Sequence, residues 1–382
     1  MQSRKFAVVI VSMTALVVVW LLYLRSGRYV GPDAELKRED NGSQSVTTSE
    51  SRLARTRTPG ITPSPDGPAA VEPQPLALAQ GEQPPLKLSS EQIEKFLRRN
   101  QRSADSLRIA FLVARDTNHL NEAATRFPNH PKVQLSVLLQ NDYPEERGKW
   151  LDAFKESSPE NSLANYLAAR EYFNSGKLDE AIKELIEATR KPVFQDYTAD
   201  SLLALEELSR EAGLSPLEAR TTAQAGWASE HMTELAQLKN LTHGVVDLRK
   251  QYQTAGDAQS VEHLSQLAVA LAGRLNSGDE SKFMINQLLG IGIERLSLGQ
   301  LPQDTPFDFL AGKTPKERAD ELLQQSQELN SLARNFASVF SDMTENERTA
   351  YCEKFRLDGE LEAMRWLRQR TQGAQPRREN HR

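Results

Sequence analysis

One long apolar segment near the start of the chain constrains how the whole protein is built. Residues 6–24 (FAVVIVSMTALVVVWLLYL) run for 19 positions without a charged side chain, between Arg4-Lys5 and Arg25. A helix rises about 1.5 Å per residue, so this segment is long enough to cross the hydrocarbon core of a bilayer. We predict a single transmembrane anchor with basic flanks in residues 1–28.

The alternative for this segment is a cleaved secretory signal peptide. Signal peptides have an apolar region of about 7–15 residues, followed by a cleavage site with small side chains. The apolar run is longer here, and the residues after it, Tyr23-Leu24-Arg25-Ser26, offer no such site. The sequence therefore favours an uncleaved anchor.

The orientation of the anchor follows less directly from charge. Arg4 and Lys5 precede the apolar run, and Arg25 and Arg28 follow it, so the positive charges are nearly balanced. A short basic N-terminus usually stays in the cytoplasm, and long C-terminal domains cross the membrane with little regard to charge. We expect the C-terminal part to be periplasmic or otherwise extracytoplasmic. The cytoplasmic orientation remains the alternative.

A proline-rich segment separates the anchor from the rest of the chain. Residues 29–88 contain nine of the 19 prolines among Ser, Thr, Gly and charged residues. Such a segment cannot bury enough apolar surface to offset the entropy lost on ordering. We predict a disordered linker that holds the following domain away from the membrane surface.

From Ser89 to Arg370 the apolar residues recur at intervals of three and four, which is typical of helices, and strand-like alternation is absent. We predict an all-α helical domain at 89–300, a C-terminal helical segment at 301–370 and a basic disordered tail at 371–382. The expected helices are 90–101, 103–115, 118–126, 131–140, 145–156, 161–174, 178–190, 197–211, 216–238, 241–254, 258–276, 281–298, 315–341, 345–355 and 359–370.

Helix starts are marked by capping boxes, in which a Ser or Thr precedes a Glu or Gln by three positions. Four stretches fit this spacing: Ser89–Gln92, Ser215–Glu218, Thr314–Glu317 and Thr344–Glu347. The helix expected at 315–341 is rich in Gln, Leu and Glu, so it is either coiled-coil-like or a long amphipathic core helix. We favour the core helix.

Residues 162–193 (SLANYLAAREYFNSGKLDEAIKELIEATRKPV) resemble a tetratricopeptide repeat, a 34-residue helix–turn–helix unit. Small side chains at Ala169, Ala181 and Ala188 match positions where the two helices approach, and Gly176 matches the turn. The segment departs from the family at Asn165, where a large aromatic is usual. Residues 131–159 look like a degenerate preceding copy. The resemblance implies helical hairpins in a repeat array or an irregular α-solenoid.

Repeats of this family bind peptides or proteins on the concave face built by the first helix of each pair. Carried onto this sequence, that face would present Tyr166, Arg170, Phe173 and Asn174, which we take as candidate partner-binding residues. Packing between repeats is the alternative role for them. The Lys and Asn pattern that some members use to hold a C-terminal carboxylate is absent, so the resemblance does not support a chaperone-tail receptor.

Charge argues against nucleic acid as a partner. Residues 91–364 carry a net charge of −12, and the arginines of the C-terminal tail offset part of it. Phosphate recognition needs a basic face, which this body lacks. The tail arginines could contact anionic lipid or an acidic protein. Cations are also favoured near a helix C-terminus and at a frayed chain end, so we interpret the tail as solvated.

The sequence contains no motif for catalysis or for a cofactor. Cys352 is the single cysteine, which excludes an intrachain disulfide, and its helical context predicts a buried apolar role. The six histidines show no His-Glu-x-x-His spacing, and no phosphate-binding loop or nucleophile elbow occurs. We therefore expect no enzyme activity, no metal site and no cofactor.

Together these features predict an all-α protein that is tethered to a membrane through residues 6–24 and binds a protein or peptide on its helical-repeat face. We expect it to act as an interaction or scaffold module in the bacterial cell envelope. Two alternatives stay open: an envelope hydrolase that uses Glu residues, and a membrane-held regulator that faces the cytoplasm.

Overall fold

The structure is a computed structural model that describes residues 88–140, 145–340 and 342–373. The predicted anchor, residues 29–87 of the predicted linker and residues 374–382 of the predicted tail lie outside this range. Within the described residues, no helix combines the length and the hydropathy needed to cross a bilayer.

The regular structure of the described residues is helical, which confirms the all-α prediction. The first half of the described chain forms α2 (Ser90–Arg99), α3 (Ala104–Ala114), α4 (Thr117–Arg126), α5 (Pro131–Leu139), α6 (Arg147–Ser157), α7 (Leu163–Asn174), α8 (Leu178–Arg190) and α9 (Thr198–Glu211). The second half forms α10 (Pro216–Thr254), α11 (Ala258–Leu275), η1 (Glu280–Lys282), α12 (Met284–Leu298), η2 (Asp308–Leu310), α13 (Pro315–Phe340), α14 (Glu345–Asp358) and α15 (Glu360–Gly373).

One helix prediction is wrong. The two helices expected at 216–238 and 241–254 form a single helix, α10, of 39 residues. Lys239-Asn240, where a break was expected, contains neither proline nor glycine, so nothing in the backbone chemistry ends the helix there. The helix instead ends at Thr254, two residues before Gly256, which has a φ of +76°.

The predicted capping boxes are present at all four helix starts. At Ser215 the hydroxyl accepts a hydrogen bond from the backbone N–H of Glu218, and the Glu218 carboxylate accepts one from the N–H of Ser215. The same reciprocal pair occurs at Ser89, Thr314 and Thr344. These bonds satisfy N–H groups that the first turn of a helix leaves without an intrahelical partner.

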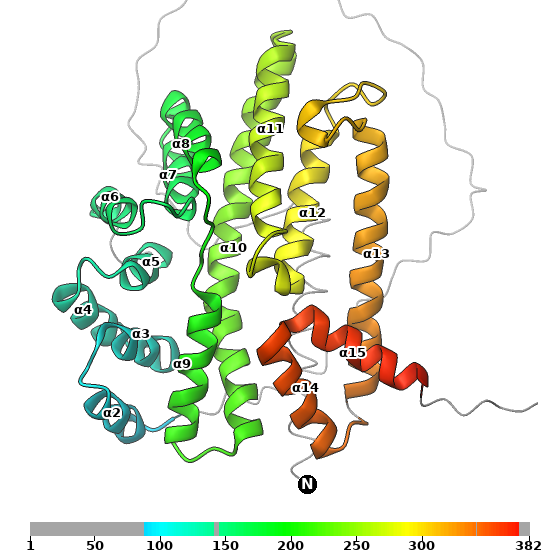
Figure 1. Cartoon of the computed structure of the whole chain (residues 1–382). Coiled ribbons are helices and arrows are strands. Elements are labelled where there is room, and N and C mark those ends of the chain that lie inside the picture. The colour runs from blue at the N-terminus through cyan, green and yellow to red at the C-terminus, as the bar shows by residue number, and fades with distance from the viewer. Residues whose placement is uncertain (1–87, 141–144, 341, 374–382) are drawn as a thin grey trace, which may run out of the picture. The chain divides into compact units, whose positions relative to one another are not determined.

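Helix α10 runs through the middle of the described helices. It packs against α7, α9, α3 and α5 on one side and against α11, α12 and α14 on the other. Figure 1 shows the same arrangement, with α2–α8 on one side of α10 and α12–α13 on the other. Residues of α9, α10 and α12 therefore meet in the interior.

The hairpin predicted at 161–190 is present as α7 and α8, which pack against each other. Gly176 makes the turn with a φ of +71°, a conformation that L side chains rarely adopt. Helix α7 also packs closely on α10, because Phe173 lies against Gly244. A Cβ added at Gly244 would lie 2.9 Å from Cγ of Phe173.

Arg249 ties three helices together from the interior. Its side chain is fully buried, and its guanidinium donates hydrogen bonds to the carbonyl oxygens of Leu296 and Ser297 at the end of α12. It also donates to Ser265 of α11 and to the side chain of Gln300. Burial lowers the pKa of Arg249 to about 10, and the carbonyls at a helix C-terminus favour a cation there.

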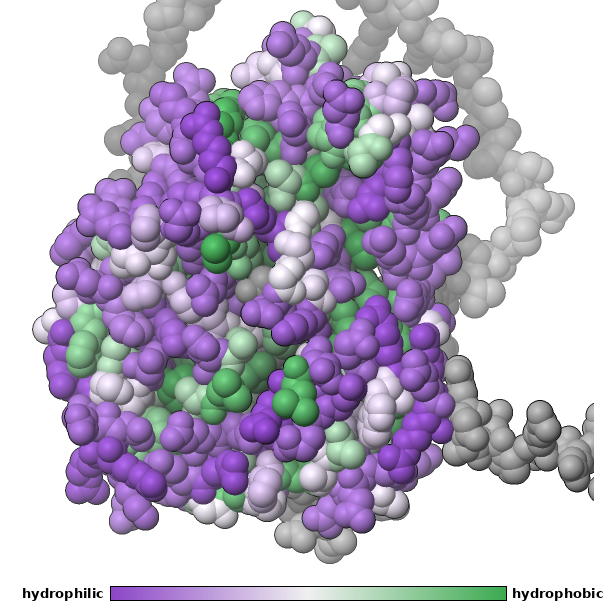
Figure 2. Space-filling view, in the orientation of Figure 1, coloured by the Kyte–Doolittle hydropathy of each residue, from purple (hydrophilic) through white to green (hydrophobic). Residues whose placement is uncertain are grey.

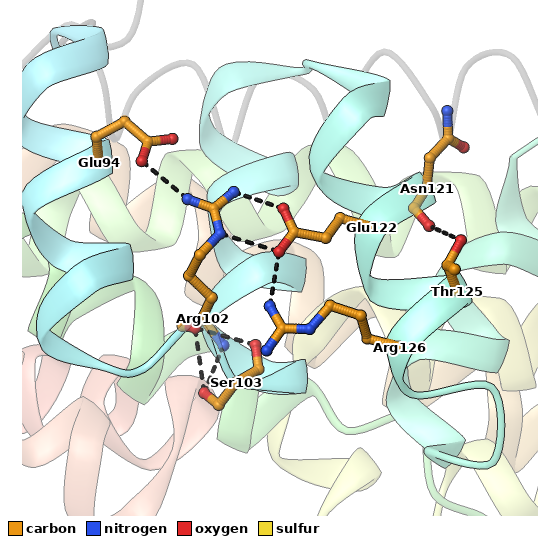
Figure 3. A network of polar contacts seen from close by, with 8 residues as sticks. Glu94, Arg102, Ser103, Asn121, Glu122, Thr125 and Arg126 are labelled. Carbon is orange, nitrogen blue, oxygen red and sulfur yellow. Dashed lines mark hydrogen bonds and ion pairs between the residues drawn. The ribbon is translucent and has the colours of Figure 1, made fainter.

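A polar network joins the first three described helices (Figure 3). Arg102, in the turn between α2 and α3, donates hydrogen bonds to Glu94 of α2 and to Glu122 of α4. Arg126 donates to the same Glu122 carboxylate from one turn along α4. The hydrogen bond from Arg102 is the main cause that lowers the pKa of Glu122 to about 2. The network is part-exposed and fixes the approach of these helices.

Cys352 is buried in α14, at 4% exposure, as the sequence predicted. Burial raises the pKa of its thiol to about 11. A thiol with so high a pKa is almost entirely protonated at neutral pH, and the thiolate is the reactive form. Cys352 therefore serves packing.

Candidate functional site

The segment between α8 and α9 brings an acidic side chain into the interior. Asn161 holds this segment: its Oδ1 accepts a hydrogen bond from N of Gln195 (3.0 Å), and its Nδ2 donates one to O of Gln195 (2.8 Å). The next residue, Asp196, caps α9 by accepting the Thr198 N–H through Oδ1 (2.8 Å). Tyr197 between them has a φ of 60°, which is uncommon for a bulky residue. The Asp196 side chain is only 2% exposed.

Helix α10 adds three side chains at the same place. Trp227, His231 and Glu234 are separated by four and three positions, which puts them on one face of the helix. All three are buried, at 4%, 3% and 3% exposure. The Trp227 ring stacks on His231, with ring centroids 4.8 Å apart, and its Nε1–H donates to Oγ1 of Thr198 (3.2 Å).

Helix α12 orients the imidazole of His231. Nε2 of His231 lies 2.7 Å from Oδ1 of Asn286, whose side chain is fully buried. Because an amide oxygen can only accept, this contact places a proton on Nε2. The other ring nitrogen, Nδ1, lies 3.4 Å from Oδ2 of Asp196 and 3.4 Å from Oγ1 of Thr198.

Asp196, His231 and Glu234 together form what we call the buried polar cluster. Their potential metal-ligand atoms all lie within 4.8 Å of one another. The cluster borders a cavity of about 10 Å³, which is room for a single water or ion. Arg108 and Lys132 border the same cavity.

The two cations beside the cavity have acceptors outside the buried polar cluster. Nζ of Lys132 lies 2.8 Å from the carboxylate of Asp200, and the guanidinium of Arg108 donates to the hydroxyl of Ser201. Asp200 and Ser201 belong to the first turn of α9. Both cations therefore contact the first turn of α9.

Aromatic rings lead from the buried polar cluster to the surface. The Trp227 ring, which stacks on His231, lies 5.0 Å from the ring of Phe283, and Phe283 lies 6.3 Å from the ring of Phe355 in α14. Phe283 and Phe355 also line a groove. A continuous series of ring contacts therefore connects the interior cluster with the surface groove.

The groove lies between α9, α10 and α14 and encloses about 710 Å³, part of it open to solvent. Leu203 of α9 lines it and is 52% exposed, and Leu357, two residues beyond Phe355, is 67% exposed. Figure 2 shows hydrophobic residues gathered on this face over α9 and α14, with hydrophilic residues around them. We call this feature the α9–α14 groove.

Two contacts set the shape of the α9–α14 groove. Arg220 of α10 donates to the carboxylate of Glu206 (2.9 Å) and to the backbone carbonyl of Cys352, which joins α9, α10 and α14. Gly359 links α14 to α15 with a φ of +90°, and a Cβ there would lie 2.5 Å from Cβ of Lys282. This close approach and positive φ both require glycine.

The four candidate partner-binding residues lie on α7, away from the α9–α14 groove. Tyr166 is fully buried, and Phe173 packs on Gly244 of α10. Arg170 lies near Gln237 of the same helix, with 3.4 Å between Nη1 and Oε1. Asn174 is exposed. Helix α10 thus covers much of the face that the repeat resemblance assigned to a partner, and the binding role of these residues stays a prediction.

No sequence motif marks the buried polar cluster. His231 and Glu234 are three positions apart, a spacing that places them on one helix face, and this was the available signal. Asp196 precedes His231 by 35 positions and lies just before the start of α9. Only the packing of α9 on α10 brings Asp196 close to His231. The expectation of no metal site was based on sequence spacing alone.

Comparison of the chain with models of protein families, with curated proteins and with solved structures finds no match.

Proposed function

We propose that this chain is a membrane-anchored, non-enzymatic helical scaffold that binds a segment of another protein in the α9–α14 groove. The observation that carries the proposal is the groove itself, an apolar hollow with the large side chain of Leu203 half in solvent. Exposed apolar surface bordered by charge is a mark of interaction sites.

The chemistry of the groove fits an amphipathic peptide segment. Its floor is apolar, with Leu202, Phe283 and Phe355, and its rim carries both signs of charge, with Asp279, Lys282 and Arg356. A helix or extended segment with apolar anchors could bury them in the floor and pair its polar side chains with the rim. The rigid helices on both sides would limit the entropy lost on binding.

The remaining parts of the proposal come from the sequence. Residues 6–24 would anchor the chain by one membrane span, with the helical domain in the extracytoplasmic space of a bacterial envelope. The hairpin of α7 and α8 would be a tetratricopeptide-like unit whose first helix packs on α10, so the partner would use the α9–α14 groove in place of the concave repeat face.

Site-specific photocrosslinking in the cells that produce the chain tests the groove. A benzophenone side chain at Leu203 should form an adduct with a defined protein, and the same probe at Leu296, a 50% exposed leucine of α12 outside the groove, should not. With the purified adduct partner, Leu203→Asp should raise Kd by at least about tenfold, while Leu296→Asp leaves it unchanged. Equal effects at both positions would contradict the groove as the binding site.

Topology is tested separately with reporters fused after Arg382. Alkaline phosphatase, which is active only outside the cytoplasm, should be active there. A fluorescent reporter that folds only in the cytoplasm should stay dark. The opposite pair of results would overturn the envelope proposal and favour a cytoplasm-facing regulator. Clearing of purified cell wall that disappears with a single Glu substitution would instead favour the hydrolase.

A further inference from the structure

The buried polar cluster contains a carboxylate oxygen for which the surrounding protein supplies no donor. Oδ1 of Asp196 accepts the N–H of Thr198, but among the described residues no hydrogen-bond donor reaches Oδ2. The side chain is 98% buried, so bulk water does not satisfy this oxygen either. A buried carboxylate without a partner costs stability unless a cation or a proton occupies the space in front of it.

The distance between Asp196 and His231 indicates whether a shared proton or a metal cation occupies the space between them. A charge-assisted hydrogen bond from a protonated imidazole to a carboxylate is about 2.7–2.9 Å long. The observed separation of Nδ1 and Oδ2 is 3.4 Å. Two ligand atoms on one tetrahedral zinc ion, each about 2.0–2.1 Å from the metal, are separated by about 3.4 Å. The contact is too long for the hydrogen bond and fits two ligands of one ion.

The orientation of His231 also fits a ligand. Metal-binding histidines usually donate the second ring N–H to a protein acceptor, which fixes the tautomer and turns the other nitrogen toward the metal. Oδ1 of Asn286 is that acceptor for Nε2, at 2.7 Å. Nδ1 is then the ring nitrogen that faces Asp196, the Thr198 hydroxyl and the cavity.

We propose that Asp196, His231 and Glu234 bind a single Zn²⁺ ion, through Oδ2, Nδ1 and the Glu234 carboxylate. The three ligand atoms lie within 4.8 Å of one another, and the adjoining cavity has room for a single ion or water. One imidazole nitrogen and two carboxylate oxygens are ligand types that Zn²⁺ binds in proteins. Two ligand atoms on one tetrahedral zinc ion are about 3.4 Å apart, so side chains whose ligand atoms are up to 4.8 Å apart would have to move closer when an ion binds.

The position of the ion would make it a structural link. Asp196 belongs to the segment before α9, His231 and Glu234 belong to α10, and Asn286 belongs to α12. A bound ion would hold the start of α9 against α10. It would also restrict the motion of Trp227 and Phe283, whose ring contact leads to the α9–α14 groove. The inference is independent of the proposed partner, because metal binding can be present in a chain that binds nothing in the groove.

Zinc titration of the purified full chain, with any affinity tag removed and bound metal stripped by a chelator, tests the site. We expect one Zn²⁺ per chain, measured against a chromophoric competitor, and a rise in the unfolding temperature when zinc is added. Asp196→Asn and His231→Gln should each weaken binding by more than about 100-fold, since loss of a residue that only hydrogen-bonds to a ligand already changes affinity by about 10–100-fold.

The matched control is His243→Gln, because His243 is an exposed histidine on the same helix. It should leave both the stoichiometry and the affinity unchanged. Asn286→Ala should weaken binding by about tenfold through the imidazole orientation alone. Glu234→Gln provides a further ligand variant if Asp196→Asn fails to fold.

X-ray absorption of the zinc-loaded chain gives a readout that does not depend on variants. A first shell of nitrogen and oxygen ligands with one imidazole and no sulfur would support the site. Three results would overturn the proposed site. Zinc binding could survive both Asp196→Asn and His231→Gln, or the stripped wild-type chain could bind no stoichiometric zinc. The third such result is tighter binding of Mg²⁺ than of Zn²⁺.

Discussion

Glu360 turns its carboxylate toward the N-terminus of α12, where it accepts a hydrogen bond from the N–H of Met284 (2.8 Å). The residue as a whole is half-buried, but its carboxylate lies in the interior, and burial raises its pKa from 4.5 to about 7. The hydrogen bond from Met284 opposes this change and only reduces it. Glu360 is therefore a buried acid that changes its charge near neutral pH.

A raised pKa of an acid makes the folded state less stable as it ionises. Below about pH 4.5 the carboxyl is protonated in both the folded and the unfolded chain, and stability is unaffected. Between pH 4.5 and about 7 the unfolded chain ionises first, so the free energy of unfolding falls as pH rises. At about 1.4 kcal/mol per pKa unit the loss reaches about 3 kcal/mol.

We expect Glu360→Gln to remove this loss. The amide keeps the shape and can still accept the N–H of Met284, but it never ionises. Denaturant unfolding at pH 4.5 and pH 8 should show equal stabilities for the two proteins at the lower pH and a variant that is more stable by about 2–3 kcal/mol at the higher pH. The exposed Glu353→Gln is the control, and a similar gain there would contradict the assignment to Glu360.

At the scale of elements, α10 contains two glycines in very different surroundings. Gly244 faces the ring of Phe173 on α7, and an added Cβ would lie 2.9 Å from Cγ of that ring. Gly226 faces Leu205 on α9, and an added Cβ would lie at an ordinary contact distance of 3.7 Å. The same substitution at the two positions therefore tests how closely α7 packs on α10.

Gly226→Ala should stabilise the chain by about 0.5–1 kcal/mol, because alanine is the better helix former. Gly244→Ala has the same gain in helix propensity, but the added methyl forces Phe173 or the whole of α7 to move, which costs about 1–3 kcal/mol. We therefore expect Gly244→Ala to lower the free energy of unfolding. Thermal unfolding of both variants measures the difference in sign. If both variants are stabilised, α7 does not lie as close to α10 as described.

Element boundaries were largely predictable because they depend on local chemistry. Capping boxes at Ser215 and Thr344 and the turn at Gly176 mark helix ends through bonds and backbone angles within a few residues. Helix α10 continues through Lys239-Asn240, where a break was predicted, so local chemistry does not decide every boundary. An expected break without a proline, glycine or cap has no local cause, and packing on both sides keeps the helix whole.

At the scale of the whole molecule, α14 and α15 cover aromatic side chains of other helices. Tyr351 and Phe355 of α14 contact Phe336 and Phe340 of α13 and Phe283 before α12, with ring centroids 5.1–6.3 Å apart. Without these two helices, a wall of the α9–α14 groove and a large part of this aromatic cluster would face solvent.

Removal of residues 343–382 should therefore lower the free energy of unfolding by about 5 kcal/mol or more, since each fully buried aromatic contributes about 1.5–3 kcal/mol. The shortened chain should bind an apolar dye such as ANS. Removal of residues 374–382 alone is the control and should leave the unfolding midpoint unchanged. A shortened chain with unchanged stability and no dye binding would show that α14 and α15 dock only weakly.

The sequence by itself determined the all-α class, most helix ends to within about three residues, the buried state of Cys352 and the α7–α8 hairpin. Each of these depends on residues close together in the chain. Only the tertiary structure brought Asp196 to His231 and opened the α9–α14 groove, because both sites join helices distant in sequence. It also turned the face of α7 that was expected to bind a partner toward α10. Helical periodicity says which side of a helix is buried, but the packing of the whole chain decides what buries it.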